Sequence, residues 1–181
     1  PHDDALKAAE PVSGIFDLST NGGTEPMSTS NCYIVNAPGT YSLPLVYGNA
    51  IKNGAKNSSA YTTEIAGLSE NFVNHRNAYI TDPYIYNNSN CEPDNATLVW
   101  QDAKNLVNGI RLDDAKQNLI FTIDQETIKE GNAVIALKNS SNEVMWSWHI
   151  WVTDMKAGTG FTTVPDGENQ YQVLNRNVGE C

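Results

Sequence analysis

The chain has 181 residues, the length of one ordinary domain, which is enough to bury a substantial core. Eleven Lys and Arg against 21 Asp and Glu give a net charge of −10, so we expect neither nucleic-acid nor membrane binding. No apolar run reaches the roughly 18 to 20 residues that span a bilayer, so we expect no transmembrane segment. The many Asn, Thr, Ser and Gly residues are typical of exported β-proteins.

Residues 1–30 show little apolar periodicity. Turn-forming residues interrupt them at 21–23 and at Pro26. This pattern predicts a leader or linker over residues 1–30 that is partly extended, followed by a single folded domain over residues 31–181.

Strand signals begin at residue 32. The apolar run 32–35 ends at a Pro-Gly turn, and apolar residues then alternate over 41–47. Pro44 cannot donate a ladder hydrogen bond, which predicts an edge strand or a bulge there. In the less regular stretch that follows, the spacing of Ile65, Leu68 and Phe72 predicts one short helix.

The second half has a cleaner strand pattern. Apolar or alternating runs occupy 96–100, 106–112, 119–123, 133–137 and 144–153. The polar connection 139–142 has the length of a hairpin loop, and Asp113-Asp114 is typical of a solvated turn. Seven to nine strands without long helical crossovers predict an all-β fold, an antiparallel β-sandwich of Greek-key, immunoglobulin-like or transthyretin-like type.

The segment 144–153 is rich in tryptophan. In a strand, one face is wholly apolar and should enter the core: Val144, Trp146, Trp148, Ile150 and Val152. The other face places His149 and Trp151 about 7 Å apart. Such a pair can stack on a ligand such as a sugar, although a Trp in this position also packs under loops.

Three cysteines are too few for a disulfide framework or a zinc site of the CxxC type. Cys32 lies in an apolar run and is expected to be a buried thiol. If one disulfide forms, we expect it between Cys91 and Cys181.

Signature motifs of enzymes are missing from the sequence: GxSxG, HExxH, a Walker loop, GxGxxG and an EF-hand loop. The acidic stretches 92–95 and 166–168 each supply too few oxygens for calcium. We therefore expect no catalytic residues, no metal, no cofactor and no enzymatic activity.

Four segments in this order resemble a module of fimbrillin-like surface lipoproteins of Bacteroidetes: 31–35, 39–41, 131–137 and 146–154. The resemblance covers about residues 14–181. It implies a secreted, lipid-anchored or pilus-associated β-sandwich at the cell surface, the outer membrane or the fimbrium, which adds to other subunits or host surface ligands by β-strand addition. The end of the chain, 173–181, is similar to a segment that continues further in the family, which leaves open a domain truncated at its carboxyl terminus.

Two functions from different classes follow. The first is a non-enzymatic structural or adhesive module of a bacterial surface fibre or surface lipoprotein. The alternative is a cell-surface glycan-binding domain, suggested by His149, Trp151 and further aromatic residues: Tyr79, Tyr84, Tyr86 and Trp100.

Overall fold

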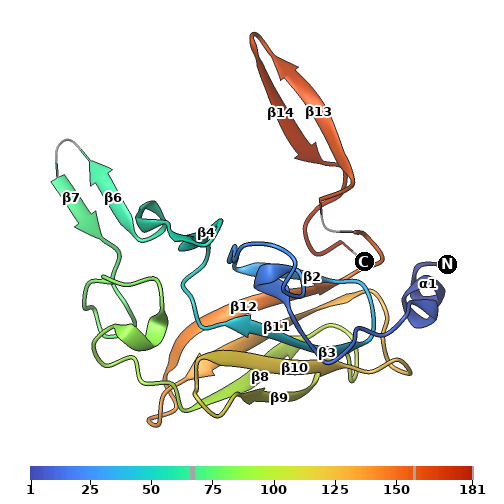
Figure 1. Cartoon of the computed structure of the whole chain (residues 1–181), viewed down its shortest axis with the longest axis horizontal. Helices are drawn as coiled ribbons and strands as arrows, with labels where there is room; N and C mark the ends of the chain where they lie inside the picture. Colours follow the sequence, from blue (N-terminus) through green and yellow to red (C-terminus); the bar gives the residue numbers. More distant parts are fainter. Residues whose placement is uncertain (66–67, 157, 181) are drawn as a thin grey trace.

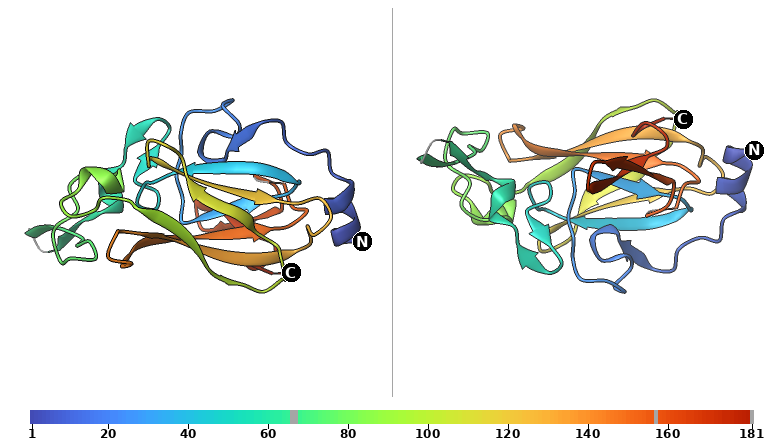
Figure 2. Two further views of the ribbon diagram at one scale, coloured as in Figure 1. Left: turned by 90° about the horizontal axis from the view of Figure 1, so that it is seen from below. Right: turned by 90° about the horizontal axis from the view of Figure 1, so that it is seen from above.

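Two four-stranded β-sheets form the body of the protein (Figures 1 and 2). The computed structural model describes residues 1–65, 68–156 and 158–180. The first sheet has the order β1 (Ile15–Asp17), β3 (Gly39–Pro44), β10 (Asn118–Ile123) and β9 (Asn108–Leu112). The second has the order β2 (Cys32–Val35), β12 (Val144–Val152), β11 (Gly131–Lys138) and β8 (Asn95–Gln101). The predicted all-β sandwich is confirmed.

The hydrophobic core lies between the two sheets and is built from alternate residues of their strands. From β10 and β11 it takes six side chains that are at most 1% exposed: Leu119, Phe121, Ile123, Ala133, Ile135 and Leu137. Full burial of a Leu, Ile or Phe side chain contributes about 1.5–3 kcal/mol, so this period of two is what holds the layers together.

The outer strands at one side of the sandwich depart from a purely antiparallel arrangement. β1 pairs with β3 in parallel, and β2 pairs with β12 in parallel, whereas the remaining neighbours are antiparallel. β3 lies between β1 and β10, but β1 pairs only with Thr40 to Ser42, so Pro44 has a described strand on the β10 side alone, where it pairs with Asn118. The open side suits a residue that has no N–H to donate.

The predicted hairpin of the second half is the pair β11 and β12. Asn139 shapes its loop, because its side-chain oxygen accepts the backbone N–H groups of Ser141 and Glu143. The apolar face of β12 enters the core from Trp148 onward, but Val144 is 50% exposed. A bulge opposite Lys138 interrupts the register there, so the period of two does not extend to the first residue of the strand.

Residues 1–30 contribute to the folded body beyond a leader or linker. They form the one α-helix of the described residues, α1 (His2–Ala8), then β1 and the 3-10 turn η1 (Leu18–Thr20). The side chain of Leu6 is fully buried, and the N–H of Val12 donates to the carbonyl of Pro38. These anchors are isolated along the chain, so they produce no periodic pattern in the sequence.

The helix predicted from Ile65, Leu68 and Phe72 is wrong. Two antiparallel strands, β6 (Thr62–Ile65) and β7 (Leu68–Asn71), occupy this region, and residues 66–67 between them are not described. The preceding pair β4 (Ile51–Lys52) and β5 (Ala55–Lys56) is joined by Asn53 and Gly54, both at positive φ, as a two-residue hairpin requires. Two further 3-10 turns are η2 (Ser58–Ala60) and η3 (Ile85–Asn87).

In the described part of the chain, no helix is both long enough and apolar enough to cross a membrane.

Candidate functional site

His149 and Trp151 share the outer face of β12, but the chain itself covers them. Trp151 is 1% exposed, and its indole N–H donates to the carbonyl of Glu180 at 3.2 Å. One residue earlier, the Gly179 carbonyl accepts from the side-chain amide of Asn132. In this structure the ring of Trp151 is therefore not accessible to a ligand, because residues near Glu180 cover it.

The half-buried His149 belongs to a polar network beneath the same segment. Its Nε2 lies 2.7 Å from Asn132 Oδ1. The Asn132 amide nitrogen already donates to Asp102 and to Gly179, so Asn132 Oδ1 accepts and His149 Nε2 carries the hydrogen. Burial lowers the pKa of His149 below 6.5, with the negative charge of Asp102 acting in the opposite direction. This histidine is consequently a neutral structural group.

The two cysteines that the structure describes, Cys32 and Cys91, offer no activated thiol. Cys91 is fully buried and forms no disulfide with another described residue; its sulfur lies 3.7 Å from the Tyr47 hydroxyl and 3.4 Å from the Asn74 amide. Burial raises its pKa, and burial also raises the pKa of the partly buried Cys32 to about 11, so both are protonated near neutral pH. The predicted partner Cys181 lies outside the described residues, and the Cys91–Cys181 disulfide stays a prediction.

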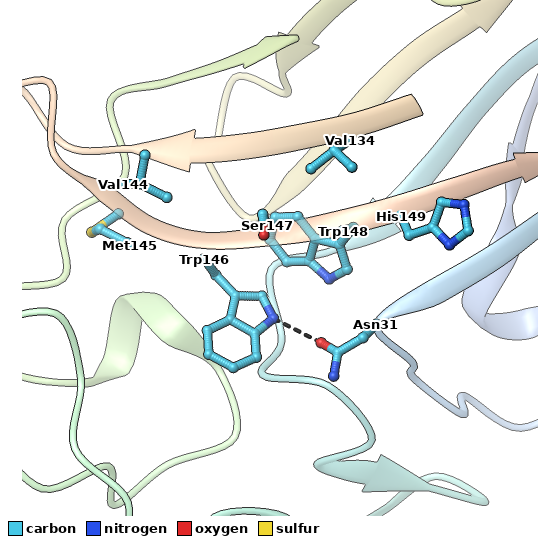
Figure 3. Close-up of a pocket in the computed structure, with 8 residues that line it drawn as sticks. All are labelled: Asn31, Val134, Val144, Met145, Trp146, Ser147, Trp148 and His149. Carbon is cyan, nitrogen blue, oxygen red and sulfur yellow. Dashed lines mark hydrogen bonds between the residues drawn. The ribbon is translucent and has the colours of Figure 1, made fainter. Parts of the chain in front are cut away.

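A shallow groove of about 500 Å³ lies beside the end of β12 that β2 does not cover (Figure 3). β2 pairs with β12 only from His149 onward, so no strand of the described residues lies next to the edge of β12 from Val144 to Trp148 on that side. The groove is lined by Asn31, Val134, Val144, Met145, Trp146, Ser147, Trp148 and His149. None of these is an acid, a lysine or an arginine, so the groove suits a neutral ligand.

Two tryptophans of the groove differ in how their N–H groups are satisfied. Trp146 is half-buried and donates to Asn31 Oδ1 at 3.0 Å (Figure 3). Its ring also meets the Tyr47 ring edge to face, with 5.1 Å between the ring centroids. Trp148 is 1% exposed, and its buried Nε1 has no hydrogen-bond partner among the described residues. The first ring is therefore fixed in place, whereas the second carries an unmet donor that costs about 1–3 kcal/mol.

The other aromatic residues suggested by the sequence do not form one platform. Trp100 and Tyr79 are 53% and 60% exposed, and within the described residues neither ring contacts another aromatic ring. Tyr84 and Tyr86 are partly buried and lie against each other at 5.5 Å.

The feature that sequence analysis missed is a hairpin that stands away from the sandwich, formed by β13 (Phe161–Asp166) and β14 (Asn169–Leu174) (Figure 1). We call it the arm. Among the described strands, β13 and β14 pair only with each other, and every residue from 161 to 173 is exposed. A two-stranded ribbon with both faces in water is marginally stable by itself, so contacts with another surface would stabilise the arm.

One face of the arm is apolar. The register pairs Val164 with Tyr171 and Thr162 with Val173, and these four side chains share that face. Val164, Tyr171 and Val173 are 44–53% exposed. The two strands contain no Lys or Arg, and the only charges, those of Asp166 and Glu168, are at the tip. The arm thus lacks the charged side chains that usually keep an exposed strand edge from pairing.

The side chains that could together hold a metal ion are not those of the acidic stretches considered earlier. Among the described residues, neither 92–95 nor 166–168 gathers three ligating side chains, and a single group does: His2, Glu130 and Asp154. These three residues are far apart in the chain, so no sequence motif indicates that they come together.

No family model, no curated protein and no solved structure matches this chain. The likeness to fimbrillin-like lipoproteins thus stays a prediction from short segments. What the fold and the site define is a β-sandwich with a projecting two-stranded arm and a neutral groove.

Proposed function

We propose that this chain is a non-enzymatic structural or adhesive module of a bacterial surface fibre or surface lipoprotein, and that the arm is the part that joins another protein chain. The observation that carries the proposal is the exposed arm, whose apolar face has no Lys or Arg and whose two acidic residues lie at its tip. Full burial of a large apolar side chain contributes about 1.5–3 kcal/mol. Val164, Tyr171 and Val173 are 44–53% exposed, so covering this face with another protein would still be favourable.

The acidic charge and the segments similar to fimbrillin-like lipoproteins favour the same function. A net charge of −10 keeps free copies apart in solution at low salt, so contact between copies has to come from a local apolar or backbone surface such as the arm. The backbone N–H and C=O groups along the outer edges of β13 and β14 can form hydrogen bonds with an added strand of another chain.

The test compares two pairs of lysine substitutions in the full chain. Val164→Lys with Val173→Lys places charge on the apolar face, and the matched control, Thr163→Lys with Gln172→Lys, places equal charge on the opposite face at neighbouring positions. Sedimentation velocity over a range of protein concentrations and salt measures self-association. We expect the first variant to weaken association at least about tenfold, which is 1.4 kcal/mol, and the control to change it little.

Equal association by the wild type and both variants would contradict a role of the apolar face. A location of the protein in the cytoplasm of fractionated cells would contradict the surface function itself, whatever the arm does.

The groove beside Trp146 supports glycan binding as the second candidate function. A fixed indole, the amide of Asn31 and an exposed Ser147 in a lining without acids or cations resemble what a neutral sugar requires. Titration with neutral oligosaccharides should quench tryptophan fluorescence in the wild type and in Trp100→Ala, which lies outside the groove. Trp146→Ala should lose the response, and quenching that survives this change would exclude the groove.

A further inference from the structure

Three side chains able to bind a metal meet at one end of the sandwich. His2 comes from α1, Glu130 immediately precedes β11, and Asp154 follows β12 by two residues. One ligating atom from each lies within 4.8 Å of the other two. The carboxylates are well shielded from water, since the side chain of Glu130 is 13% exposed and that of Asp154 is 28% exposed.

We propose that His2, Glu130 and Asp154 form a site for one divalent transition-metal ion, with zinc as the best match. An imidazole nitrogen with two carboxylate oxygens is an N/O set that zinc accepts, with bonds of about 2.0–2.2 Å. Calcium and magnesium prefer sites made of oxygen alone, so the histidine argues against them. Three protein ligands leave a fourth position for water.

The contacts at the site are compatible with an ion. His2 Nδ1 lies 2.8 Å from Asp154 Oδ2, and coordination would replace this hydrogen bond with two bonds to the metal after a small outward shift. Glu130 Oε1 accepts from the Thr153 hydroxyl at 2.9 Å and lies 3.6 Å from the Arg176 guanidinium. These two groups hold one oxygen of Glu130 and leave the other for the ion, which is the usual role of groups around a metal ligand.

The helix that carries His2 is held at the site independently of any metal. Asp3 Oδ1 accepts the backbone N–H of Glu130 at 2.8 Å, and the Gln125 side chain donates to the carbonyl of Lys7 at 3.0 Å. The ligands are therefore organised before binding, which removes part of the entropic cost.

Space and charge favour the same ion. A cavity of about 360 Å³ adjoins the site and has room for water; it is lined by His2, Glu130, Asn175, Arg176 and Glu180. The positive charges near the site are the guanidinium of Arg176 and the amino group of Pro1. The ligating oxygens of Glu130 and Asp154 lie within 4.8 Å of each other, so these two carboxylates repel, and a divalent cation between them removes the repulsion.

The proposal is tested on the full chain after treatment with EDTA, by calorimetric titration with zinc chloride. We expect one zinc ion per chain, and a loss of affinity of at least about tenfold for His2→Gln and for Asp154→Asn. Two matched controls should bind like the wild type: Asp4→Asn, an exposed acid of the same helix, and His75→Gln, a histidine elsewhere. Far-UV circular dichroism checks that each variant folds.

Two further measurements locate the ion. Hydrogen exchange should slow in α1 when zinc is added, because the metal ties His2 to the end of β12. The cobalt derivative should lack a thiolate charge-transfer band. Absence of zinc binding by the wild type, unchanged affinity in His2→Gln, or a thiolate band that places the metal on a cysteine would each overturn the proposal.

Discussion

Replacing Trp148 and Trp151 separately by phenylalanine should change stability by clearly different amounts. Both side chains are 1% exposed and both belong to β12, so the two changes remove the same atoms from equally buried positions. The difference lies in the indole N–H. That of Trp151 donates to the Glu180 carbonyl, whereas that of Trp148 is buried and finds no partner in the part of the chain that the structure describes.

The magnitude follows from these two environments. Trp151→Phe loses a hydrogen bond with a net value of about 0.5–1.5 kcal/mol, in addition to the lost contacts of the larger ring. Trp148→Phe loses similar contacts but removes an unmet donor, which returns about 1–3 kcal/mol. Trp151→Phe should therefore be the more destabilising of the two by about 1.5–4.5 kcal/mol.

Urea unfolding followed by far-UV circular dichroism measures this difference, with the midpoints compared at a common slope. The signal must not be tryptophan fluorescence, since each variant lacks one emitter. If Trp148→Phe were as destabilising as Trp151→Phe, the assignment of an unmet donor in the core would be wrong.

Three other outcomes are expected. His149, with a folded-state pKa below 6.5, stays neutral in the fold, so stability should be full above pH 6.5 and fall as the pH drops through that value; urea midpoints against pH should show this slope, and His149→Gln should reduce it. Asp113→Ala should cost about 1–2 kcal/mol in thermal unfolding, because Asp113 accepts the N–H groups of Gln117 and Asn118 in the turn between β9 and β10; Asp114→Ala, its neighbour, should have little effect. Gly54→Ala should lower the melting temperature by an amount equivalent to about 1 kcal/mol, because φ is +76° there; an unchanged melting temperature would contradict the turn geometry.

The fold could be predicted from the sequence wherever a strand is buried on one side. The alternation of Leu119, Phe121 and Ile123 reports directly which face meets the core, and the polar loop after Lys138 marks the hairpin. The region of Ile65 and Leu68 failed because a spacing of three residues fits one turn of helix as well as two strands joined by a short connection.

The site was less predictable, because it depends on contacts between distant segments. The period of two correctly placed His149 and Trp151 on one face, yet no feature of the local sequence predicts that the segment around Glu180 covers that face. The same holds for His2 and Asp154, which are 152 positions apart and meet only in the folded chain. The arm was missed for another reason: Thr, Gln and Pro separate the few apolar residues of β13 and β14, so no clear strand pattern marks residues 161–174.

The parallel pairing of β2 has a consequence for the order of folding. Cys32 lies opposite His149, so β2 leaves the ribosome long before the strand it pairs with is made. The hairpin of β11 and β12 needs only a short loop, whereas closing β2 onto β12 encloses most of the polypeptide and carries a larger entropic cost. We therefore expect β2 to dock late, so that newly made chains pass through a stage in which the edge of β12 is open along its whole length. Surfaces of that kind are where chaperones bind and where premature association between nascent chains begins.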